Sequence, residues 1–167
     1  MMDYMRSINR MLHDEHMATI ALLERIESTL AAHRKAPPDA KAPDIAAVLR
    51  DLVASVEADI SVHFAFEQDE LFTRLSEAGD TGMTSILQEE HDVILPLGEQ
   101  VSGLARTAID SGFTEESWAE FRRLSAELVE RMIAHIQKEE MGMLAALEEI
   151  LDEDADMAVM MRYAELR

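Results

Sequence analysis

Apolar residues recur along most of the chain at intervals of three and four, the spacing that places side chains on one face of an α-helix. Four long stretches carry such a stripe, and they begin near residues 3, 44, 83 and 114. A shorter fifth stretch covers 155–166. Proline and glycine fall between the stretches, in segments 35–43, 79–82 and 110–113, which we expect to be loops or turns.

The ends of the predicted helices carry recognisable residues. The first helix is expected from about Asp3 to His33, the second opens at Asp44 as its cap, and the fourth opens at Thr114, followed by two glutamates. Pro96 lies inside the third stretch and is expected to kink it. The predicted inward stripe of the first helix comprises Met5, Ile8, Leu12, Ile20, Leu23 and Leu30.

This pattern predicts an all-α protein. Four long helices joined by short loops pack best as an antiparallel up-down four-helix bundle, here over about residues 3–150, with a C-terminal helical extension at about 155–166. We expect the 167 residues to form a single domain, because the chain is too short for two sizeable cores. The six glycines and four prolines are too few for a fold with many β-turns.

Charge and cysteine content exclude several classes of partner. The net charge of −19 argues against binding to nucleic acid and to anionic membranes, because both require a basic surface. With no cysteine, the chain has neither disulfides nor thiolate metal sites. No window is apolar enough to span a membrane or to form the core of a signal peptide, so a cytoplasmic protein is expected. The sequence does not indicate an oligomeric state.

Histidines and glutamates interrupt the apolar stripes at matching places. In the second and fourth helices a histidine is followed four residues later by a glutamate, so both point to the same interior spot. The first and third helices each place one histidine on the stripe. The candidate metal ligands are His16, His63, Glu67, His91, His135 and Glu139.

A cation explains this arrangement best. Two carboxylates inside an apolar core cost several kcal/mol each unless something compensates them, and no lysine or arginine lies on these stripes. The pattern also occurs twice: Glu15-His16 is matched by Glu90-His91, 75 residues later, and His63–Glu67 by His135–Glu139, 72 residues later. The repeat predicts a pseudo-two-fold bundle in which two carboxylates bridge two metal ions, each held by two imidazoles.

The other bundle that holds two metal ions is the ferritin-like fold, which requires Glu-x-x-His pairs. None of the six histidines has an acidic residue three positions before it. The spacing therefore disfavours a ferritin-like carboxylate site.

The pattern His…His-x-x-x-Glu…His…His-x-x-x-Glu resembles that of the hemerythrin-like (HHE cation-binding) family across the whole four-helix region. The resemblance implies a non-haem di-iron centre on the six residues, in which Glu67 and Glu139 bridge the two irons and an oxide or hydroxide forms a further bridge. Oxygen-carrying hemerythrins have a further histidine where this chain has Leu95, and an aspartate in place of this glutamate of the last helix. The site is thus similar to the six-ligand variety of bacterial proteins linked to nitric oxide response and iron–sulfur repair.

Function follows from this ligand set as an expectation. An open position on a redox metal in a dry pocket suits a small molecule such as O2, NO or peroxide. We expect a di-iron protein that binds or senses O2 or NO. The alternatives are an enzyme that reduces NO or peroxide, an iron donor for damaged clusters, and an interaction module that uses the metal only for structure. Whether the protein is an enzyme is left open, and imidazole with carboxylate also suits manganese or zinc.

The remaining candidate residues receive weaker assignments. His13 lies one turn before His16 and is either an additional ligand, a partner of a ligand or a surface residue. His33 ends the first helix, where a cation complements the helix dipole. The twelve methionines are expected mainly to fill the core. Three aromatic residues are assigned no role beyond packing: Tyr4, Trp118 and Tyr163.

Overall fold

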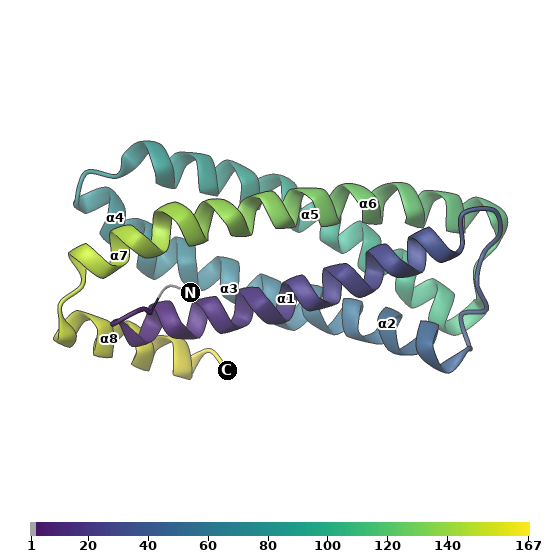
Figure 1. The fold of residues 1–167 in the computed structure, drawn as a ribbon, viewed down its shortest axis with the longest axis horizontal. Helices are drawn as coiled ribbons and strands as arrows, with labels where there is room; N and C mark the ends of the chain where they lie inside the picture. Colours follow the sequence, from purple (N-terminus) through teal and green to yellow (C-terminus); the bar gives the residue numbers. More distant parts are fainter. Residues whose placement is uncertain (1–2) are drawn as a thin grey trace.

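A computed structural model describes residues 3–167, and it is helical throughout apart from short connections (Figure 1). Its α-helices are α1 (Ser7–Ala32), α2 (Pro43–Ala54), α3 (Ser61–Phe66), α4 (Thr73–Glu77), α5 (Thr81–Ser111), α6 (Glu115–Lys138), α7 (Leu144–Ile150) and α8 (Glu153–Glu165). Three π-helical segments, η1 (Ser55–Ile60), η2 (Glu67–Phe72) and η3 (Glu139–Met143), join some of these helices without a break. The predicted all-α class is confirmed.

Four long rods form the bundle. The first rod is α1, the second runs from α2 through α4, the third is α5, and the fourth runs from α6 through α7, with successive rods pointing in opposite directions (Figure 1). The helix α8 turns back and lies beside the first half of α1, with which it makes contacts. Within the described part of the chain, none of these helices is long and apolar enough to cross a membrane.

Helix boundaries confirm some sequence predictions and correct others. Thr114 caps α6 as predicted, because its side chain accepts a hydrogen bond from the Ser117 amide and the Ser117 hydroxyl accepts one from the Thr114 amide. The predicted cap Asp44 is wrong: α2 begins at Pro43, which suits the first helical position because it has no N–H to satisfy. Helix α5 continues through Pro96 and ends before Gly112, whose φ of 78° is the left-handed conformation that favours glycine.

The amino end of α1 is capped by a distant part of the chain. The backbone amides of Ser7 and Ile8 donate to the carboxylate of Asp156 at 2.8 and 3.0 Å, and the amide of Arg6 donates to Glu148 at 3.0 Å. The first amides of a helix have no partner within it, so these two acids supply the missing acceptors. Asp156 is buried and thereby fixes α8 to α1.

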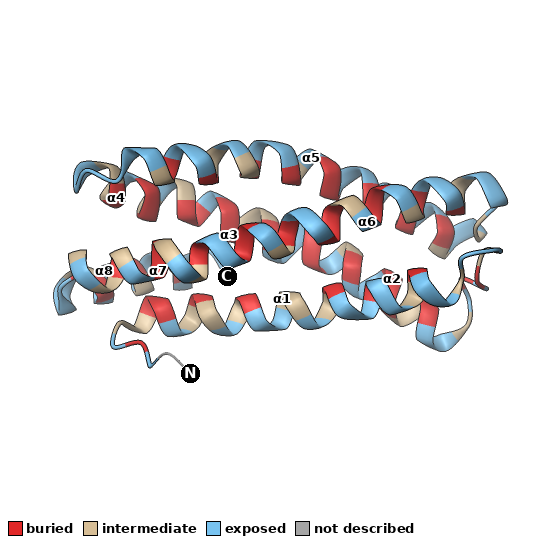
Figure 2. Cartoon of the chain, turned by 45° about the horizontal axis from the view of Figure 1, so that its top comes forward, coloured by how far each residue is buried: buried red, intermediate tan, exposed pale blue. Residues whose placement is uncertain are grey.

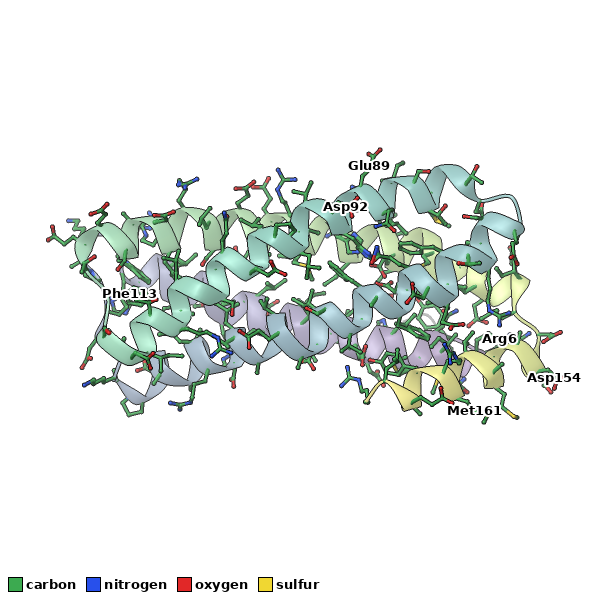
Figure 3. The ribbon with its side chains drawn as sticks, turned by 180° about the vertical axis from the view of Figure 1, so that it is seen from behind. Arg6, Glu89, Asp92, Phe113, Asp154 and Met161 are labelled. Carbon is green, nitrogen blue, oxygen red and sulfur yellow. The ribbon has the colours of Figure 1, made fainter. Side chains whose placement is uncertain are left out.

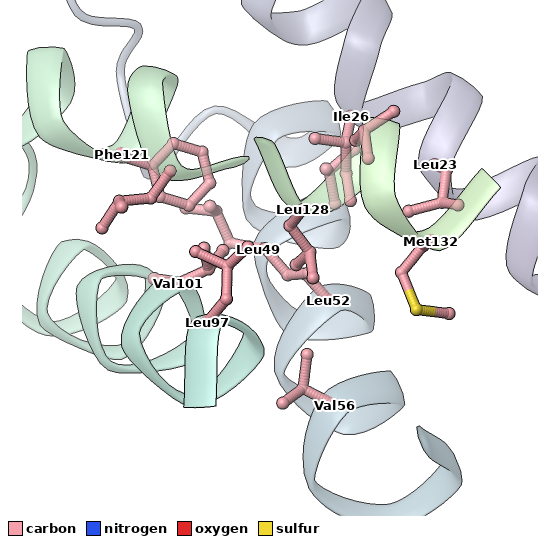
Figure 4. Packing of buried hydrophobic residues seen from close by; sticks show 14 of the residues in the cluster. Leu23, Ile26, Leu49, Leu52, Val56, Leu97, Val101, Phe121, Leu128 and Met132 are labelled. Carbon is pink, nitrogen blue, oxygen red and sulfur yellow. The ribbon is translucent and has the colours of Figure 1, made fainter. Parts of the chain in front are cut away.

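Buried residues recur at helical spacing along the face of each rod that is turned towards the other rods (Figure 2). They divide into two apolar clusters, one at each end of the bundle. The larger cluster packs leucine, valine and aromatic side chains of α1, α2, α5 and α6 (Figure 4). The smaller cluster joins the first turns of α1 to α4, α7 and α8. The candidate metal ligands lie along the helices between these two clusters.

The structure contradicts the expectation for the methionines. Met132 and Met143 are buried, but Met5 is 77% exposed and does not belong to the inward stripe of α1. Met141, at 79% exposure, likewise faces water. A flexible, unbranched side chain is tolerated on a helix surface as well as in a core, so methionine is a poor marker of the buried face.

The π-helical segments are the main departure from the predicted helices. Glu67 is the first residue of η2 and Glu139 is the first residue of η3. Both predicted bridging glutamates therefore stand where the helix changes from α to π geometry. Such segments are rare and frequently accompany functional sites, because the wider turn redirects the side chains of the helix.

Candidate metal centre

The structure brings all six predicted ligands together in the middle of the bundle. His16 comes from α1, His63 from α3, His91 from α5 and His135 from α6, and every one of these side chains is buried. The two glutamates, Glu67 and Glu139, have 0% exposure. The flanking residues of α5, Glu89 and Asp92, point outward instead (Figure 3).

The ligand atoms form two groups that share a glutamate. His16, His63 and Glu139 form one group, and Glu67, His91, His135 and Glu139 form the other, with the atoms of each group within 4.8 Å of one another. Each group thus contains two imidazoles, one pair from the first two rods and one pair from the last two.

Each glutamate contacts one histidine from each half of the chain. Glu67 Oε1 lies 3.1 Å from His63 Nε2 and 3.6 Å from His91 Nε2. Glu139 Oε2 lies 3.4 Å from His16 Nε2, and its Oε1 contacts His135 Nε2. This is the arrangement in which a carboxylate can bridge two cations.

The donor set fits metal ions because its atoms are not satisfied by the protein. Both carboxylate oxygens of Glu67, both of Glu139 and Nε2 of His16 are buried without a hydrogen-bond partner in residues 3–167. Nε2 of His91 faces Nε2 of His135 at 3.1 Å, which brings two nitrogen lone pairs together unless a proton or a cation lies between them. Leaving so many buried polar atoms unpaired costs free energy that a bound cation would recover.

Without a cation, protons take over part of its role. Burial and the charge of Glu139 raise the pKa of Glu67 to about 8. Burial opposes ionisation of His16, but the adjacent carboxylates of Glu139 and Glu140 outweigh it and raise the pKa of His16 to about 9. Burial and the neighbouring charge of His135 lower the pKa of His91 to about 3. In the absence of a cation, the raised pKa values of Glu67 and His16 thus favour protons on the candidate ligands themselves.

Three glutamates outside the predicted set orient the histidines. Glu15 lies 2.9 Å from Nδ1 of His63, Glu90 lies 2.8 Å from Nδ1 of His135, and Glu140 lies 2.8 Å from Nδ1 of His16. A carboxylate on Nδ1 fixes the ring and directs Nε2 towards the metal position. Burial raises the pKa of all three acids, but contact with these histidines, and for Glu90 first of all with Lys138, outweighs it and lowers the pKa of each.

Sequence reasoning did not assign these three acids, although the sequence carried a sign of two of them. Glu15 and Glu90 precede the matched histidines of the internal repeat. The structure gives each of them the same task in its own half, since each contacts the histidine of the following His-x-x-x-Glu motif. The repeat therefore includes two of the three outer carboxylates as well as the candidate ligands.

His91 is held differently from the other three histidines. Its Nδ1 has no hydrogen-bond partner within the described chain, and its ring stacks on Phe64 with a centroid distance of 3.7 Å and an interplanar angle of 4°. Gln68 stands 72 residues before Glu140, at the equivalent position of the repeat, yet no hydrogen bond joins it to His91 among the residues described. The pseudo-two-fold symmetry is therefore broken at this ligand.

A cavity of about 450 Å³ reaches the ligands from the surface. Its inner end is lined by His16, His63, His135 and Glu139, and its walls carry mostly small and apolar residues. Charged side chains line its outer part: Arg25, Asp51, Asp59 and Arg167. The cavity lies between α1 and the second rod and borders four of the six candidate ligands.

The remaining predicted residues have defined places. His13 is a partner of the site, since its Nδ1 lies 2.9 Å from Glu140, which also contacts His16. His33 directly follows the last residue of α1, so it stands at the helix end as expected. Leu95 packs against the larger apolar cluster.

The three aromatic residues do more than pack. Trp118 Nε1 donates to the His33 carbonyl at 2.8 Å. The Tyr4 hydroxyl donates to Glu140 at 3.0 Å, and the Tyr163 hydroxyl donates to Glu15.

The fold and the site define a helical bundle that binds metal through histidine and glutamate. Residues 7–147 match the family model described as the Hemerythrin HHE cation binding domain. The chain belongs to this family, and the resemblance inferred from its motifs is confirmed. No curated protein shows significant similarity to the sequence.

Proposed function

We propose that this protein is a non-haem di-iron protein that binds or senses O2 or NO. His16 and His63 would hold one iron, His91 and His135 the other, and Glu67 and Glu139 would contact both. The observation that carries the proposal is the placement of each glutamate between histidines of the two halves, with its oxygens buried and otherwise unpaired.

The donor set is compatible with iron, and we assign iron as the metal of this centre. Iron accepts mixed imidazole and carboxylate ligands, and when bound it supplies an open coordination position and a change of oxidation state. The protein's own contribution is to orient the imidazoles through neighbouring acids and aromatic rings and to pack an apolar cluster on each side of them.

The cavity supports a small ligand as the partner. Its walls near the ligands include Ile60, Phe64, Met132 and Ile136, which favour apolar molecules over ions. O2 and NO are small and uncharged, and they dissolve readily in apolar surroundings. We therefore assign the cavity as the route by which the diatomic ligand reaches the centre.

Metal analysis and stopped-flow spectroscopy test the proposal. Purified protein loaded with iron is expected to hold two irons per chain, and mixing the reduced form with O2 or NO should produce a new charge-transfer absorption band. His63→Ala should lose iron and the band, whereas His33→Ala, outside the site, should keep both. Two zinc ions with no iron in protein from iron-replete cells, or no spectral change with either gas, would refute it.

The same experiment separates binding from catalysis. A binding or sensing protein consumes one gas equivalent per di-iron centre, whereas an enzyme that reduces NO or peroxide continues to consume its substrate when an electron donor is present.

We also propose that the chain forms one domain, because α8 contributes Val159 and Tyr163 to the smaller apolar cluster of the bundle.

A further inference from the structure

In each half of the candidate metal centre, the carboxylate that contacts a histidine is itself paired with a cation, and the two cations come from different parts of the chain. In the second half, Glu90 contacts His135 and is held by an ion pair with Lys138, the residue just before Glu139. The equivalent residue in the first half, 72 positions earlier, is Phe66. Phe66 is buried and carries no charge, so the first half lacks this cation.

The helix α8 supplies what the first half lacks. The Arg167 guanidinium, just beyond its end, donates to Glu15 Oε1 at 2.6 Å, and the Tyr163 hydroxyl donates to the same oxygen. Nε of Arg167 also donates to the Tyr163 hydroxyl at 2.8 Å, which closes a three-membered network. The other oxygen of Glu15 contacts Nδ1 of His63 at 2.9 Å.

Phe66, at the position equivalent to Lys138, is in direct contact with α8. The ring of Phe66 packs edge-on against the ring of Tyr163, with centroids 4.9 Å apart. Phe66, which stands at the position equivalent to Lys138, thus packs against α8, and the residue just beyond α8, Arg167, provides the cation that contacts Glu15. The family match ends at residue 147, so α8 lies outside the part of the chain that the family model covers.

We propose that α8 is part of the metal centre, with Tyr163 and Arg167 acting as positioning residues that fix Glu15 and, through it, His63. The inference rests on the proposed metal site. Hydrogen bonds from Tyr163 and Arg167 occupy one oxygen of Glu15 and leave the other for His63. Loss of these bonds lets Glu15 swing into solvent, and His63 then loses the contact that directs its Nε2 inward.

The test compares iron loss from variants of the full chain. Tyr163→Phe combined with Arg167→Gln removes both donors and keeps the ring that packs against Phe66. Iron-loaded protein is mixed with excess ferrous chelator, and the rate of iron loss is followed together with the absorption spectrum. Substituting a residue that orients a metal ligand weakens metal binding by roughly 10- to 100-fold, so we expect iron loss to accelerate by a comparable factor.

Two controls exclude a general effect of weakening α8. Arg162→Gln removes an ion pair between α8 and Glu70 without touching Glu15 and should leave the rate unchanged. Arg167→Lys, with Tyr163 unchanged, keeps a cation beside Glu15. Its rate of iron loss should stay close to that of the wild-type protein. Thermal unfolding of the metal-free variants, followed by circular dichroism, verifies that each remains folded.

A second cycle assigns the effect to Glu15. Glu15→Gln alone should accelerate iron loss, and adding the Tyr163 and Arg167 substitutions to it should have no further effect. The role of α8 would be overturned if the Tyr163 and Arg167 substitutions accelerated iron loss equally in the wild-type protein and in the Glu15→Gln variant. It would also be overturned if the double variant at Tyr163 and Arg167 lost iron at the wild-type rate. These outcomes differ from failure of the proposed function, in which the wild-type protein itself would hold no iron pair.

Discussion

Replacing Glu67 by glutamine tests the claim that this carboxyl group destabilises the bundle until a metal binds. Glutamine has nearly the same shape as a protonated glutamate and cannot ionise. The side chain of Glu67 is fully buried, and burial together with Glu139 raises its pKa from 4.5 to about 8. In metal-free protein the substitution should therefore stabilise the fold.

The size of the gain depends on pH in a way that the raised pKa fixes. A carboxyl group whose pKa is higher in the folded state contributes most at low pH, and its contribution is lost as the pH rises from 4.5 towards 8. Each pH unit in that range costs about 1.4 kcal/mol. Glu67→Gln should thus raise the unfolding free energy by about 1 kcal/mol at pH 5.5 and by about 4 kcal/mol at pH 7.5.

Urea denaturation of metal-free protein, followed by circular dichroism at both pH values, measures these gains. Glu149→Gln, an exposed position of α7, is the matched control and should change stability by less than about 0.5 kcal/mol at either pH. Equal gains for Glu67→Gln at both pH values, or a loss at pH 7.5, would refute the reasoning. With iron present the order should reverse, because only the wild-type site gains the full binding free energy.

Three further substitutions probe other parts of the structure. Glu139→Gln removes a charge that contacts histidines of both halves, so metal analysis should find the bound metal reduced to about one ion per chain or fewer. Thr114→Ala removes the cap of α6 and should lower the unfolding free energy by about 1 kcal/mol in urea denaturation, with metal content unchanged. Ala54→Leu narrows the cavity and should slow NO association several-fold in stopped-flow measurements, without loss of iron.

The fold and the clustering of the six candidate ligands could be predicted because both depend on short-range spacing. Apolar periodicity located the four rods, and a histidine and glutamate four residues apart had to share a helix face. The capping role of Thr114 could likewise be predicted, because it depends only on Thr114 and the residues that directly follow it. The structure confirms the family and the helical class, and it gathers all six predicted ligands into one buried cluster.

The π-helical segments were missed although the sequence carried a sign of them. His63, Glu67, Leu71 and Leu75 follow one another at intervals of four, and all four are buried. An α-helix has 3.6 residues per turn, so repeated steps of four would rotate the last residue off the inner face. A wider turn at Glu67 keeps the series facing inward. The run from His135 to Leu147 repeats this spacing with its own π-helical segment.

The outer network could not be predicted, because it depends on contacts between distant parts of the chain. Tyr163 and Glu15 are 148 residues apart, and Tyr4 and Glu140 are 136 apart. No spacing rule links such positions, and a tyrosine that donates a hydrogen bond looks in sequence like one that only packs. The exposed Met5 and Met141 show the converse limit, since an apolar residue need not be inside.

The capping of α1 by Glu148 and Asp156 has a consequence for biosynthesis. Ribosomes release the amino end of a protein first, yet the opening turn of α1 finds its acceptors only after residues up to 156 have emerged. A nascent chain can therefore pair its first helices early, but the first turn of α1 lacks these acceptors until residue 156 has been synthesised.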